Sequence, residues 1–75
     1  MAAPRPPITI SPEYLGGTPV FTGTRVPVRS LFDYLQAGDT LAEFLRQFPT
    51  ITHEHAIAVL ALARERVAPD VERAA

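Results

Sequence analysis

Residues 27–49 read PVRSLFDYLQAGDTLAEFLRQFP and contain the pattern on which the predicted fold rests. Pro27 suits the first position of a helix because its φ is fixed near the helical value, and Gly38 suits the position just after the end. Between them, apolar residues recur three and four positions apart, as on an amphipathic helix: Val28, Leu31, Phe32 and Leu35. The stretch therefore predicts a first helix from Pro27 to just before Gly38.

Two more helices are predicted downstream. Thr40 and Glu43 have the spacing of a capping box, and Pro49 stops the helix that follows them. The apolar positions of this second helix are Leu41, Phe44, Leu45 and Phe48. Thr52 can cap a third helix that runs to about Val67, where Ala68 and Pro69 end it.

Two short β-branched segments precede the helices. Residues 8–10 read ITI and residues 20–22 read VFT, and the roughly nine residues between them exceed a tight hairpin loop. The strands can therefore pair with each other or across a dimer axis. The predicted fold is mainly α: two short N-terminal β-strands followed by a three-helix bundle with a helix-turn-helix-like layout.

The length and composition indicate one small domain that needs stabilisation from outside its own core. We expect a flexible proline-rich arm over residues 1–7, a single domain over 8–67 and a frayed tail over 68–75. A core of this size rarely supplies more than about 3–5 kcal/mol, so a homodimer or a complex is expected. The chain has no 18-residue apolar run and no apolar segment typical of a secretion signal, which predicts a cytoplasmic protein without a membrane partner.

Several kinds of catalytic and cofactor site are excluded by residue type. The chain has no Cys and no Lys, which excludes thiolate zinc sites, cysteine nucleophiles and the phosphate-binding loop of NTPases. No nucleophile–base pair is recognisable, so we expect neither an enzyme nor a cofactor. His53 and His55 point to different sides of a helix, and Ile57 stands where a zinc protease needs a third histidine. Solvated histidines at a helix start are predicted there rather than a metal site.

A candidate anion site lies at the start of the first helix. Arg25 and Arg29 are four residues apart and adjoin the backbone N–H groups of Gly23 and Thr24. Together, Thr24, Arg25 and Arg29 could bind a DNA phosphate or a carboxylate of a partner. Equally, Arg29 can pair with Asp33 one helical turn later, a weak surface interaction.

The third helix is apolar on every side over residues 56–63, AIAVLALA. Such a helix is expected to be buried between layers or at a subunit interface, and it lacks the polar side chains that read the major groove of DNA. Together with the unpaired strand edges, it predicts a dimer or partner interface at the following residues: Ile8, Ile10, Val20, Phe21, Val59 and Leu62.

Residues 17–28, GTPVFTGTRVPV, resemble the signature of a small prokaryotic family known as domain of unknown function 433. The resemblance continues through QAGDT at 36–40 and EFLRQFP at 43–49, and it covers residues 8–67. Phe21 stands where the family usually has Ile or Val. The resemblance implies a homeodomain-like three-helix fold, and many members look like antitoxins encoded beside a PIN-like nuclease toxin.

Two functional hypotheses follow. The first is an antitoxin-like, non-catalytic interaction protein that dimerises, neutralises a PIN-like nuclease toxin and binds its own operator DNA. The second is a stand-alone DNA-binding transcriptional regulator that uses Arg25 and Arg29 on phosphates.

Overall fold

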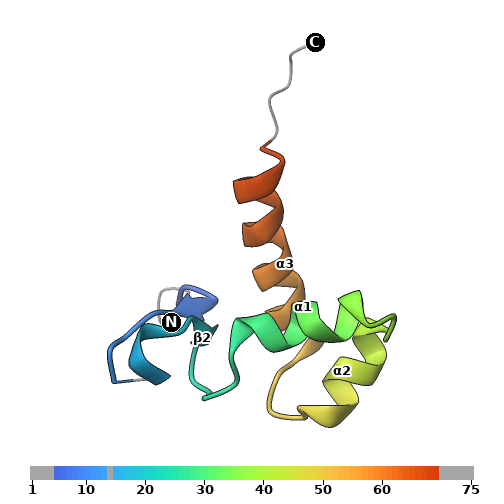
Figure 1. The fold of residues 1–75 in the computed structure, drawn as a ribbon, viewed down its shortest axis with the longest axis horizontal. Coiled ribbons are helices and arrows are strands. Elements are labelled where there is room, and N and C mark those ends of the chain that lie inside the picture. Colours follow the sequence, from blue (N-terminus) through green and yellow to red (C-terminus); the bar gives the residue numbers. More distant parts are fainter. Residues whose placement is uncertain (1–4, 14, 70–75) are drawn as a thin grey trace.

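The computed structural model describes residues 5–13 and 15–69, which form two paired strands and three helices (Figure 1). The strands are β1 (Ile8–Thr9) and β2 (Val20–Phe21), with a short 3₁₀ turn η1 (Leu15–Gly17) between them. The helices are α1 (Val28–Gln36), α2 (Leu41–Gln47) and α3 (His53–Val67). The predicted mainly α class, with two short N-terminal strands before three helices, is confirmed. The predicted arm and tail fall partly outside the described residues, at 1–4 and 70–75.

The two strands pair with each other inside one chain. They run antiparallel, with Ile8 opposite Phe21 and Thr9 opposite Val20. This arrangement settles the pairing that the long connection left open. Both β2 side chains are fully buried, whereas those of β1 are half-buried.

The end of the proline-rich segment is fixed to the fold rather than flexible as predicted. The Thr22 N–H donates to the Pro7 carbonyl at 3.0 Å, and the Thr22 hydroxyl donates to the Pro6 carbonyl at 2.6 Å. The Thr22 hydroxyl has a single proton, which it donates to the Pro6 carbonyl. In its contact of 2.8 Å with the Thr9 hydroxyl, Thr9 is therefore the donor and Thr22 the acceptor. Proline lacks an N–H but keeps its carbonyl as an acceptor. The sequence pattern alone did not reveal that Thr22 donates to the carbonyls of Pro6 and Pro7.

A tight turn at Gly23 leads the chain from β2 into α1. The Thr24 N–H donates to the Phe21 carbonyl at 2.9 Å, and Gly23 lies between them with φ +83°. Pro27 forms a bridge with Val20 and has ψ 140°, an extended conformation. The prediction that Pro27 is the first helical residue is therefore wrong by one position, because this bridge holds Pro27 as the N-cap and α1 begins at Val28.

Gly23→Ala is expected to destabilise the domain by about 1–2 kcal/mol, the cost of a left-handed conformation for a residue with a Cβ. The new Cβ would also lie 2.8 Å from a guanidinium nitrogen of Arg5, which can move aside. The matched control is Gly38→Ala, because Gly38 has φ +96° with no atom within 4 Å of the added Cβ. Urea unfolding of both variants separates the two contributions; equal losses would show that the Arg5 contact costs nothing, and no loss in either would contradict the backbone argument.

The predicted end of α1 at Gly38 and the predicted start of α2 at Thr40 are confirmed by their hydrogen bonds. Gly38 follows α1, where its N–H donates to the Leu35 carbonyl at 3.1 Å and the Asp39 N–H donates to the Tyr34 carbonyl at 2.9 Å, the Schellman arrangement. The Thr40 hydroxyl accepts from the N–H of Glu43 at 3.0 Å and so caps α2. The Glu43 carboxylate contacts Arg46 and Gln47 of its own helix instead of the Thr40 N–H, so only the Thr40 half of the predicted capping box forms.

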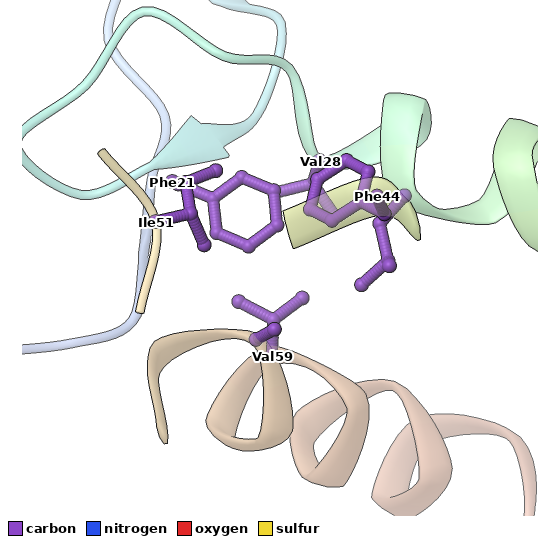
Figure 2. Packing of buried hydrophobic residues seen from close by; sticks show 7 residues of the cluster. Phe21, Val28, Phe44, Ile51 and Val59 are labelled. Atoms are coloured by element: carbon purple, nitrogen blue, oxygen red, sulfur yellow. The ribbon is translucent and has the colours of Figure 1, made fainter. Parts of the chain in front are cut away.

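The core lies where β2, α1, α2 and the first half of α3 meet. Figure 2 shows Phe21, Val28, Phe44, Ile51 and Val59 converging from these elements and from the turn before α3. The Phe44 ring is central, with its centroid 5.9 Å from that of Phe21 and 4.9 Å from that of Phe48. The fold therefore depends on a small aromatic centre.

Only the first half of α3 belongs to this core. Ala56 and Val59 are buried, whereas Ile57 is 43% exposed and Leu62 is 40% exposed. The second half rises away from the body formed by the strands, α1 and α2 (Figure 1). Of the two expectations for residues 56–63, burial between layers of the chain is wrong for this stretch as a whole, because the two shorter helices and two-residue strands are too small to surround a helix of this length. Burial at a subunit interface stays a prediction.

Candidate interaction surface

The predicted anion site is not assembled around Thr24, because the polar groups of this residue bond within the turn. Its hydroxyl donates to the Phe21 carbonyl at 2.8 Å and accepts from the Val26 N–H at 3.0 Å. Its own N–H is bonded to the same Phe21 carbonyl. Thr24 therefore locks the turn between β2 and α1, and its assignment to anion binding is corrected.

The two arginines of the predicted anion site lie on the surface. Arg25 is exposed. The Arg29 Nε atom lies 3.9 Å from Oδ2 of Asp33, with both side chains largely exposed. Of the two interpretations of Arg29, the structure contains the intrahelical pair with Asp33, an interaction worth a few tenths of a kcal/mol at this exposure.

The predicted interface residues divide into core and surface groups. Val20, Phe21 and Val59 are fully buried within the chain, so their assignment to an interface is corrected. They are buried because β1 pairs with β2 and α3 packs over Phe21, which leaves no free surface at these side chains. Ile8 is half-buried against the core, whereas Ile10 is 67% exposed and Leu62 is 40% exposed. Ile10 and Leu62 are therefore the predicted interface residues that a partner can reach.

The two histidines have different environments. His53 is exposed, as predicted, but His55 is half-buried, and its Nε2 atom lies 2.9 Å from the Pro7 carbonyl. The edge of the His55 ring packs on Phe21, with 5.2 Å between ring centroids. The prediction of a solvated His55 is therefore wrong. The sequence contained one indication that His55 is partly buried: it lies four residues before Val59 and therefore on the side of α3 that faces the core.

Within residues 5–13 and 15–69, no group of three His, Asp or Glu side chains is arranged to hold a metal ion. In the same part of the chain, no helix has the length and apolar character needed to cross a membrane.

Two hollows follow one side of α3, between this helix and the N-terminal segment. The first, of about 400 Å³, lies between residues 5–7 and the start of α3, where it is lined by Glu54, His55 and Ala58. The second, of about 270 Å³, lies beside the outer half of α3 and is mostly apolar. It is lined by eight residues of the N-terminal segment, α1 and α3: Ile8, Ile10, Val28, Phe32, Val59, Leu62, Ala63 and Arg66. Two residues of this apolar groove, Ile10 and Leu62, have large exposed apolar side chains.

The described residues form a small domain of two strands and three helices with an apolar groove beside α3. The chain matches the model of the family described as "Protein of unknown function (DUF433)" over residues 8–63, more than half of its length, and it belongs to this family.

Two relatives are similar to this chain. The uncharacterized protein y4eO of Sinorhizobium fredii (strain NBRC 101917 / NGR234) is 43% identical over 54 residues, which are 72% of this chain and 24% of that protein. The crystal structure of a DUF433 member protein from Anabaena variabilis ATCC 29413 superimposes with a TM-score of 0.71 at 32% identity, over 88% of this chain and 63% of that chain. The chain thus spans about a quarter of the first relative and under two thirds of the second.

Proposed function

We propose that this chain is an antitoxin-like, non-catalytic interaction protein that forms a homodimer and neutralises a PIN-like nuclease. The observation that carries the proposal is the apolar groove beside the outer half of α3, with Ile10 and Leu62 exposed along it. A small domain that leaves large apolar side chains beside a protruding helix gains stability when a partner covers them. The family resemblance carried by the signature around Gly23 and Thr24 supports a nuclease as the partner that covers Ile10, and a second copy of the chain is the other partner that the proposal names.

The arrangement of polar groups also favours binding over chemistry. Thr24, which the sequence offered as an anion-binding residue, and His55, which it offered as a solvated histidine, both bond to backbone atoms of their own chain. Their role in the fold is structural, and the proposal assigns no catalytic residue. The alternative of a stand-alone DNA-binding regulator has less support, since the Asp33 carboxylate lies 3.9 Å from the Arg29 Nε atom and lowers the net positive charge there.

The test is co-expression with the nuclease-like product of an adjacent gene, followed by size-exclusion chromatography and an RNA-cleavage assay. We expect the two proteins to co-elute and the cleavage to stop. Ile10→Glu is expected to weaken the complex at least tenfold, because an apolar anchor of the groove becomes charged.

Ile57→Glu is the matched control, since Ile57 is also exposed but lines neither hollow. It is expected to bind like the wild type. Absence of a complex with the neighbouring nuclease, or equal weakening by the two substitutions, would refute the proposal.

A further inference from the structure

The outer half of α3 extends beyond its own fold. The helix has 15 residues and is therefore about 22 Å long. Its buried residues, Ala56 and Val59, are both in the first half, and Val67 at the far end is 84% exposed. A short helix that packs against nothing has little stability in water, so a partner that covers the second half of α3 is expected to stabilise it.

One row of side chains on α3 follows both hollows. Glu54, Ala58, Leu62 and Arg66 are each four residues apart and form one ridge along the helix. Glu54 and Ala58 line the first hollow, and Leu62 and Arg66 line the apolar groove. The row thus faces the open side of the molecule along its whole length.

The order of these four residues is self-complementary. From the start to the end of α3 the row has an acidic, a small, a large and a basic side chain. In a second copy that runs antiparallel, the same row presents these side chains in the reverse order. Glu54 of one copy then meets Arg66 of the other, and Leu62 meets the small Ala58. A parallel pair would instead place like charges together. Neither Glu54 nor Arg66 forms an ion pair with another described residue of its own chain.

We infer that two copies of this chain pair through their α3 helices, antiparallel and about a twofold axis between Ala58 and Leu62. The inference rests on the homodimer of the proposed function and names the surface that forms it. Each outer half of α3 lies along the first hollow of the other copy, where the Leu62 side chain covers Ala58. A twofold axis requires a surface that complements itself, and this row does so in both charge and size. Antiparallel helix dipoles favour the same orientation.

The test is sedimentation equilibrium of the 75-residue chain alone, over a wide concentration range. The wild type is expected to dimerise, and Leu62→Glu is expected to raise the dimer Kd at least tenfold. Ile57→Glu serves as the control: Ile57 is exposed at 43% against 40% for Leu62, on the same helix, but it lies off the row. Ile57→Glu is expected to keep the wild-type Kd. Circular dichroism checks that both variants keep their helices.

A charge exchange tests the antiparallel order itself. Glu54→Arg and Arg66→Glu are each expected to weaken the dimer, and the double variant is expected to recover most of the wild-type affinity. Both substitutions oppose the dipole of α3, so the double variant does not regain helix stability, and its recovery reports the pairing between copies.

A monomeric wild type, a wild-type Kd for Leu62→Glu, or a double variant as weak as the single ones would overturn the inference. No nuclease is present in these measurements, so their failure is separate from failure of nuclease neutralisation, although a monomeric wild type would also contradict the homodimer of the proposed function. A monomeric chain that still captures the nuclease through this row would overturn the helix pairing and leave nuclease binding intact.

Discussion

Phe44→Ala is expected to leave the chain largely unfolded at 25 °C. Phe44 is fully buried at the aromatic centre, where its ring centroid lies 5.5 Å from that of Tyr34 and 4.9 Å from that of Phe48. Removing a buried phenylalanine side chain costs about 3–5 kcal/mol, which equals the whole stability that a core of this size rarely exceeds. Far-UV circular dichroism with a urea titration measures the loss.

Phe48→Ala is the control for this prediction, because Phe48 is the same kind of side chain but only half-buried at the rim of the core. It is expected to remain folded with a lower urea midpoint. A wild-type midpoint for Phe44→Ala would contradict the assignment of Phe44 to the centre of the core.

Thr24→Val is expected to destabilise the domain by about 1–3 kcal/mol. Valine matches the shape of threonine but can neither donate to the Phe21 carbonyl nor accept from the Val26 N–H, which is left without its acceptor. The loss is large for one surface turn because the turn sets the path from β2 into α1. The measurement is the free energy of unfolding in urea.

Thr24→Ser provides the control, since it keeps the hydroxyl and is expected to retain most of the stability. If Thr24 served an anion site instead, Thr24→Val would keep the wild-type stability and lose only binding. That outcome would reverse the structural assignment made for this residue.

The sequence predicted those parts of the fold that neighbouring residues determine. The stop at Gly38 and the caps at Thr40 and Thr52 each depend on hydrogen bonds that span five residues or fewer, and all three are confirmed. The same local rules gave the order of strands and helices. Pro27 shows their limit, because its fixed φ suits a helix but a bridge with Val20 fixes its ψ in the extended range.

The candidate site was less predictable because exposure depends on distant parts of the chain. Val20 and Phe21 have the composition of an interface strand as much as of a core strand, and only the packing of α3 over β2 decides between them. Residues 56–63 are apolar throughout, yet composition does not show how much of a helix the rest of a small domain can cover. Ile10 and Leu62 were named from the sequence and are exposed, and their role in an interface stays a prediction. The row from Glu54 to Arg66 becomes evident only beside the hollows.

The contact between His55 and Pro7 bears on the order in which the chain folds. It joins residues 48 positions apart, whereas α1 and α2 are held together by segments close in sequence. Closing a long loop costs more conformational entropy than closing a short one, so contacts between near neighbours form first. We therefore expect the helical pair α1–α2 to form early and the N-terminal segment to dock onto α3 last.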